Sequence, residues 1–148
     1  MATPQDADLI LKLYDLRREK QMRKARNYLI IQFFPQNMDD IKAMFLDRKH
    51  PEYNAYFRQV TTYWDMAAAM VNHGAIDRDL FFETNGELFA VWAKVSDHIE
   101  GLREFLSPLF LVNLEKLIAS YPEGQARVQA TKERLKKIAA QIAAQDKN

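Results

Sequence analysis

The chain has 148 residues, of which 48% are apolar and 28% charged, and its formal net charge is +1. This is the composition of one globular domain, and the small net charge excludes a strong overall attraction to nucleic acid or to an anionic membrane. The absence of cysteine excludes disulfides, thiolate metal sites and cysteine nucleophiles, while only four glycines and five prolines favour long helices over strands and turns.

The first predicted helix covers about residues 5–34. Thr3 or Asp6 fits its N-cap, and Pro4 fits the first turn, where a missing N–H costs little. Two apolar stripes along this helix are interrupted by the charged segment RREKQ at residues 17–21. The interruption indicates a bend, or a stretch that stands off the core.

The next two predicted helices cover residues 38–48, capped by Asn37, and residues 53–73. The second of these has the clearest signal, because large apolar residues recur along it at three- and four-residue spacing. It ends at Gly74, which we place just after the C-cap, where a positive φ is inexpensive only for glycine.

The stretch VNHGAIDRDLFF, residues 71–82, raises the question of a metal or catalytic site. We interpret it as a joint between two helices. Gly74 ends one helix, Asp77 caps the next, and Asp79 lies in the positively charged first turn. Ile76 and Phe81 have the spacing of a hydrophobic staple across the start of the second helix.

Beyond the joint, apolar residues keep their helical spacing through Asn85–Gly86. This spacing predicts one helix over residues 78–105 that tolerates Gly86, and Gly101 is a second point where the helix could be interrupted. A fifth helix is predicted to start at Ser107–Pro108. The last predicted helix, residues 123–145, carries a narrow apolar seam of Val128, Thr131, Leu135, Ile138 and Ile142.

These elements predict an all-α fold, a bundle of five or six helices around one core. We expect a single domain over residues 1–148, with a long N-terminal helix and a central antiparallel hairpin made by the third and fourth helices. Residues 123–148 are expected to form a peripheral or protruding C-terminal helix.

No residues of a catalytic, cofactor or metal site stand out. His73, Asp77 and Asp79 carry groups that can ligate a hard divalent ion, but their spacing does not match an EF-hand loop. No phosphate loop, nucleophile elbow or zinc motif is present. Glu83 and Glu87 share a helix face but lack the histidines of a diiron bundle, so we expect them at the surface.

A basic contact face is one alternative. The segment RREKQMRKAR contributes Arg17, Arg18, Arg23, Lys24 and Arg26, and KERLKK in the last helix adds a second basic stretch. Such helices could contact phosphates. Acidic residues outnumber basic ones in residues 77–104, which offers a competing interpretation. In it, the basic and acidic faces pair within the protein or between subunits.

An aromatic ligand cavity is another alternative. Tyr56, Tyr63, Trp64 and Trp92 lie on the third and fourth predicted helices, whose aromatic stripes are typical of a core but could line a cavity between the helices. Their hydroxyl and indole N–H groups would then need polar partners.

The segments ARNYL, residues 25–29, and YWDMAAAMVNHGAIDRDLFFETNGELFAVW, residues 63–92, resemble a group of bacterial small helical domains of unknown function. The shared pattern is a helix ending in V-x-x-G-x-I-D-x-x-L, followed by a helix that bears a glycine and a tryptophan. The resemblance implies an α-helical domain, often next to a membrane helix, and carries no catalytic residues. The matching residues here are Val71, Gly74, Ile76, Asp77, Leu80, Gly86 and Trp92.

We therefore expect a non-enzymatic interaction or assembly module without a cofactor, which acts through its helix faces. Its expected partner is another copy of itself or another protein, in preference to nucleic acid or a membrane surface. The alternatives are a small-molecule-binding or sensory domain and a nucleic-acid-binding one. Because the N-terminus lacks a signal-peptide pattern and the apolar runs fall short of the roughly 20 residues that span a bilayer, a cytoplasmic location is expected.

Overall fold

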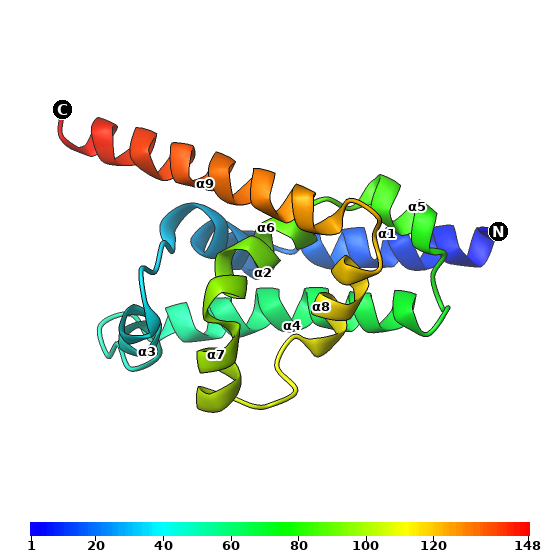
Figure 1. Cartoon of the computed structure of the whole chain (residues 1–148), viewed down its shortest axis with the longest axis horizontal. Coiled ribbons are helices and arrows are strands. Elements are labelled where there is room, and N and C mark those ends of the chain that lie inside the picture. Colours follow the sequence, from blue (N-terminus) through cyan, green and yellow to red (C-terminus); the bar gives the residue numbers. More distant parts are fainter.

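The computed structural model describes all of residues 1–148 and is helical throughout, without a β-strand (Figure 1). Besides its α-helices, the chain forms a π-helical turn at Tyr28–Gln32 and a 3-10 turn at Ser96–His98. None of the helices combines the length and the apolarity needed to cross a membrane. The α-helices are α1 (Pro4–Arg18), α2 (Lys20–Asn27), α3 (Met38–Phe45), α4 (Glu52–Asn72), α5 (Arg78–Thr84), α6 (Glu87–Val95), α7 (Ile99–Phe105), α8 (Val112–Ala119) and α9 (Gly124–Asp146).

The N-terminal helix is shorter than predicted. Thr3 caps α1 in a reciprocal capping box with Asp6, and Pro4 occupies the first turn, as expected. The helix breaks at Glu19, whose ψ of 145° is not helical and whose carboxylate accepts the Met22 N–H at 2.9 Å. The single helix over residues 5–34 is therefore wrong, but the bend that the charged segment indicated is confirmed.

Helix α4 crosses the middle of the molecule, and one apolar cluster of buried residues draws on every α-helix around it. Its main packing partners are α2 and α8, while α5 and α6 contact it less extensively. The predicted central hairpin between the third and fourth helices is therefore not the dominant contact. All-α architecture is confirmed, but more and shorter helices form than the five or six predicted.

The joint between α4 and α5 is confirmed in detail. Gly74 has a φ of 80°, and the Gly74 and Ala75 N–H groups bond to carbonyls of the last turn of α4, which is a Schellman motif. Asp77 caps α5 by accepting the Leu80 N–H at 2.9 Å. Asp6 contributes a contact that the sequence did not indicate: its Oδ1 accepts the Asp77 N–H at 2.8 Å and so ties α1 to the joint.

The predicted helix over residues 78–105 is wrong, because it is broken twice. Asn85 takes an extended conformation between α5 and α6, and its side-chain amide donates to the Phe81 carbonyl that the helix leaves free. The apolar phase persists because residues on both sides of the break face the same core. The second break is the 3-10 turn before α7, and Gly101 lies inside α7.

Helix α8 begins at Val112, later than Ser107–Pro108 predicted. Its N-cap, Leu111, has a φ of 56°, and this left-handed conformation is unfavourable for a leucine. The burial of the Leu111 side chain in the core offsets that cost. Because Leu111 has no capping oxygen, Asp65 of α4 supplies one by accepting the Leu114 N–H at 2.9 Å. The polar cap of α8 thus also fixes it on α4.

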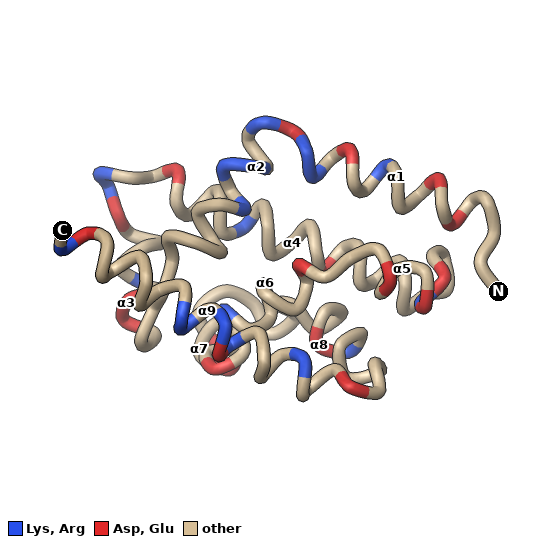
Figure 2. Tube along the Cα trace, turned by 90° about the horizontal axis from the view of Figure 1, so that it is seen from above, with Lys and Arg blue, Asp and Glu red and all other residues tan.

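Helix α9 confirms the first part of the predicted seam: Val128, Thr131 and Leu135 are buried and Ile138 packs at the edge of the core, whereas Ile142 is half-buried and does not belong to the core cluster. It lies mainly against α6, and its last residues are exposed. Figures 1 and 2 place the C-terminal end of α9 and the N-terminal end of α1 at opposite ends of the long axis.

Candidate functional site

The four aromatic residues considered for a ligand cavity are packed among other side chains. The Tyr63 hydroxyl donates to the Leu13 carbonyl at 2.5 Å, and burial raises the pKa of Tyr63 to about 12. The Trp64 indole N–H points to Glu87 at 3.3 Å, Tyr56 packs against the Tyr28 ring, and Trp92 is buried. None of these four residues lines the hollow beside α1 and the α4–α5 joint, the one between α6 and α9, the one between α3 and α7, or the one at the bend between α1 and α2.

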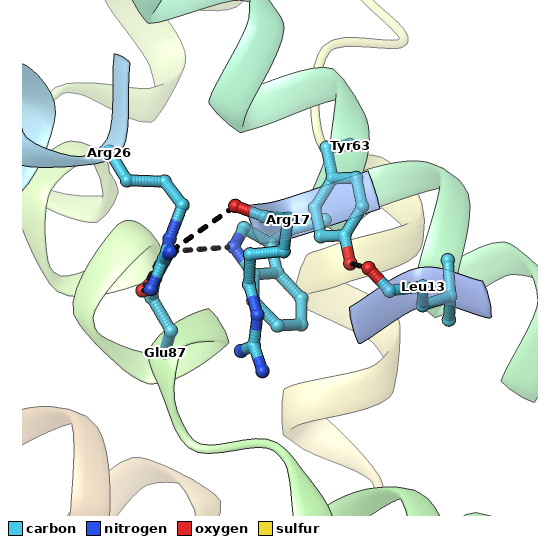
Figure 3. A network of polar contacts seen from close by, with 6 residues as sticks. Leu13, Arg17, Arg26, Tyr63 and Glu87 are labelled. Carbon is cyan, nitrogen blue, oxygen red and sulfur yellow. Dashed lines mark hydrogen bonds and ion pairs between the residues drawn. The ribbon is translucent and has the colours of Figure 1, made fainter. Parts of the chain in front are cut away.

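The predicted basic face is divided by the fold. Arg26 turns inward and makes a two-pronged ion pair with Glu87, with hydrogen bonds of 2.6 to 2.9 Å (Figure 3). This bond raises the pKa of Arg26. Arg17 is half-buried and lies over the Trp64 ring. Arg18, Arg23 and Lys24 remain exposed near the bend, interspersed with acidic Asp15 and Glu19 (Figure 2).

The pairing of basic and acidic faces within the protein is confirmed at two points. Arg26 meets Glu87, and Lys132 of the second basic stretch meets Asp97 at 2.8 Å. Glu87 is only 17% exposed, so its expected place at the surface is wrong, whereas Glu83 is exposed. At the joint, His73 is exposed and Asp77 serves as a cap, and no group of three acidic or histidine side chains is close enough to share a metal ion.

The most unusual polar group is Lys94 of α6, which the sequence reasoning missed. Its residue is only 8% exposed, and its Nζ donates to the Phe33 carbonyl at 2.5 Å and lies 3.3 Å from the centre of the Phe34 ring. No carboxylate pairs with it. A buried ammonium without a counter-ion is costly, and a carbonyl and a ring face compensate only in part.

Lys94 lines a hollow of about 510 Å³, which we call the lysine hollow. One wall consists of α6, the 3-10 turn and the segment that follows the π-helix, and the opposite wall is α9. Two more lysines and one acid border it: Lys132 is paired with Asp97, while Lys136 makes no ion pair. The residues that carry its chemistry are Phe34, Lys94, Asp97, His98, Lys132 and Lys136.

The charges favour an anion in this hollow. Lys132 and Asp97 offset each other, and Lys132 lowers the pKa of Asp97 through their hydrogen bond. Lys136 then adds one uncompensated positive charge, and Lys94 adds a second when it is protonated. The volume falls in the range of small-molecule sites, which is roughly 300 to 1,000 Å³.

Burial lowers the pKa of Lys94 from 10.5 to about 7. The unfolded chain therefore holds a proton here that the folded protein lacks between those two values, and the free energy of unfolding rises with pH across that window. Below a pH of about 7 the folded protein carries the full cost of the buried charge.

We expect Lys94→Met to stabilise the protein by about 2 kcal/mol at about pH 6, because the removed charge outweighs the lost bond to Phe33. The gain shrinks toward about pH 10, where the wild-type lysine is buried uncharged. Urea unfolding at both pH values measures the difference, with Lys137→Met on the exposed side of α9 as the control. An equal effect at both pH values would contradict the assignment.

A signal for Lys94 was present in the sequence. The run LFAVWAKV, residues 88–95, is apolar on every side of the helix except at this lysine, and such a helix is surrounded by core. All eight of these residues are buried. The partners on α9 and at Phe34–Gln36 carried no comparable signal, because those segments lie about 40 and 60 residues away along the chain.

Comparison with known proteins identifies one family. Its model, described as a domain of unknown function (DUF4760), matches residues 2–121, which include α1 to α8 and leave α9 outside the match. No curated protein and no solved structure matches the chain. Since the match covers most of the sequence, the chain belongs to the DUF4760 family of domains of unknown function.

Proposed function

We propose that this domain is a binding module for small anions that carry a carboxylate or a phosphate, and that the lysine hollow is the binding site. The observation that supports this most is Lys94, a lysine more than nine-tenths buried at the wall of a hollow and without a carboxylate partner. An anion bound there supplies the missing counter-charge.

The proposal has a thermodynamic consequence. A bound anion favours the ammonium form of Lys94 and returns its pKa toward the ordinary value. Binding above a pH of about 7 is then accompanied by proton uptake, and the affinity falls as the pH rises further. Lys136 contributes an exposed charge that attracts the ligand, while Lys94 supplies the buried contact.

The test uses inorganic phosphate, oxalate and citrate as probes. Amide NMR spectra should show shifts concentrated around Lys94, His98 and Lys136, and calorimetry in buffers of different ionisation enthalpy should show proton uptake at about pH 8. Lys94→Met should abolish binding and Lys136→Gln should weaken it, while Lys137→Gln on the same helix leaves it intact. Absence of binding by all three probes at millimolar concentration overturns the proposal.

A second candidate function is self-association through α1, which lies at the edge of the molecule (Figure 2). Leu11 and Tyr14, which share one face of this helix, are 64% and 48% exposed, and Leu16 on another side is 56% exposed. The occupant that fits is a second copy of α1 in antiparallel orientation, because Asp8 near one end would then lie close to Arg18 near the other end of its neighbour. Exposed apolar residues flanked by complementary charges are typical of helix pairing.

Light scattering at high micromolar concentration tests this candidate. We expect a dimer that Leu11→Arg converts to a monomer, whereas Leu109→Arg, at an exposed leucine in the segment before α8, leaves the dimer unchanged. A wild-type protein that stays monomeric at that concentration overturns it without affecting the proposal for the lysine hollow.

A further inference from the structure

The Lys94 amine combines three features that seldom occur together. It is buried, it faces a hollow large enough for a small molecule, and it has no carboxylate that would fix it as an ammonium. The charged and titratable groups around the hollow are Asp97 and His98 beside α6, and Lys132 and Lys136 on α9; the segment at Phe34–Gln36 contributes none. Such an arrangement favours an amine that can act as a nucleophile.

We propose that Lys94 forms an imine with small carbonyl compounds that carry a carboxylate or a phosphate. This inference rests on the proposed anion site and adds a covalent step to it. The Nζ lone pair attacks the carbonyl carbon, and proton transfer from nitrogen to oxygen gives a carbinolamine. The carbinolamine hydroxyl then takes up a proton from solvent and leaves as water, while the nitrogen lone pair forms the C=N bond of an iminium ion. Release of a proton from nitrogen to solvent gives the neutral imine. The exchange is reversible, releases one water, and requires neither an oxidant nor a reductant.

The surroundings of Lys94 support each stage of this step. Burial lowers its pKa to about 7, so that about half of the amine is uncharged and nucleophilic near neutral pH. The iminium N–H that forms can donate to the Phe33 carbonyl, which the free amine already contacts at 2.5 Å. The Phe34 ring, 3.3 Å from Nζ, stabilises the positive charge of the iminium.

Lys136 gives the site its preference for anionic carbonyl compounds. Its side chain makes no ion pair, whereas Lys132 is held by Asp97. A carboxylate near Lys136 raises the local concentration of the reacting carbonyl at Lys94 through charge attraction. An uncharged aldehyde is not attracted by the charge of Lys136. The rates at which a charged and an uncharged aldehyde react with Lys94 can therefore be compared directly.

Reductive trapping tests the proposal with glyoxylate as the probe. The full-length protein is incubated with glyoxylate and sodium cyanoborohydride, which reduces an imine to a stable carboxymethyl-lysine, and peptide mapping measures the label at every lysine. We expect Lys94 to be labelled at least about tenfold faster than Lys137. Lys136→Gln should slow labelling by glyoxylate but not by propanal. Labelling spread evenly over the lysines, or a spared Lys94, overturns the proposal.

The outcomes separate the imine from the anion site. If phosphate shifts the NMR signals of the hollow but glyoxylate leaves Lys94 unlabelled, the imine proposal fails and anion binding stands. If glyoxylate and propanal label Lys94 equally, and Lys136→Gln changes neither rate, the anion preference fails and this proposal with it. Because the wild-type protein gives the decisive signal, no outcome depends on whether a Lys94 variant folds.

Discussion

Gly124→Ala should lower the free energy of unfolding by about 3 kcal/mol, the largest effect that we expect from a single methyl group in this chain. A Cβ at Gly124 would clash with the Ile118 backbone oxygen and lie 3.1 Å from its carbonyl carbon. A backbone group at the end of α8 cannot rotate away as a side chain can. The start of α9 must therefore move, and its contacts with α6 are lost or strained.

Gly74→Ala is the matched comparison for this prediction. Gly74 has a φ of 80°, but a Cβ there would meet nothing within 4 Å. That substitution costs only the backbone strain of a left-handed alanine, about 1 kcal/mol. Urea unfolding followed by circular dichroism should rank Gly124→Ala as clearly the more damaging of the two, and the reverse order would show that the α8–α9 contact can relax.

The second large effect is expected at Glu87. Glu87→Ala removes the counter-charge of Arg26 and every hydrogen bond between the two side chains, and leaves the Trp64 indole N–H without its carboxylate. The Arg26 side chain is 28% exposed, so water compensates in part, and we expect a loss of about 2 kcal/mol. High salt should change this loss little, because a partly buried pair is weakly screened.

A double-mutant cycle with Arg26→Ala distinguishes the pair from its separate members. The double variant should be less destabilised than the sum of the two single variants, since the second deletion removes a group that has already lost its partner. Glu83→Ala, at the exposed carboxylate four residues earlier, is the control and should be nearly neutral. Strict additivity would mean that the ion pair of Figure 3 contributes no coupling.

The parts of the fold that the sequence predicted depend on local chemistry. The caps at Thr3, Asn37 and Asp77, the positive φ of Gly74 and the seam of α9 all involve residues a few positions apart. Such interactions can be inferred from spacing alone.

The errors arose where tertiary contacts override local preference. Asn85 breaks the predicted long helix although the apolar pattern continues through it, because α5 and α6 face the same core after the break. Likewise, the left-handed Leu111 delays α8, and the capping oxygen that α8 needs comes from Asp65, which lies far earlier in the chain. No window of sequence contains both members of that contact.

The site shows the same limit. That basic and acidic segments pair could be expected from their charges, but which residues pair could not, because Arg26 and Glu87 are separated by 61 positions. Lys94 could have been noticed as a cation within an apolar helix. Its neighbours Phe34 and Lys136 become visible only when the segment after the π-helix and α9 are both placed against α6.

The unequal anchoring of the two chain ends has a practical consequence. The first turn of α1 is held by the capping box of Thr3, and Asp6 in that turn accepts the Asp77 N–H, so an addition beside this turn would disturb the joint between α4 and α5. The last residues of α9 are exposed and make no ion pair. Purification tags, surface tethers and fluorophores should therefore be attached at the end of α9, where they leave the packing of the helices unchanged.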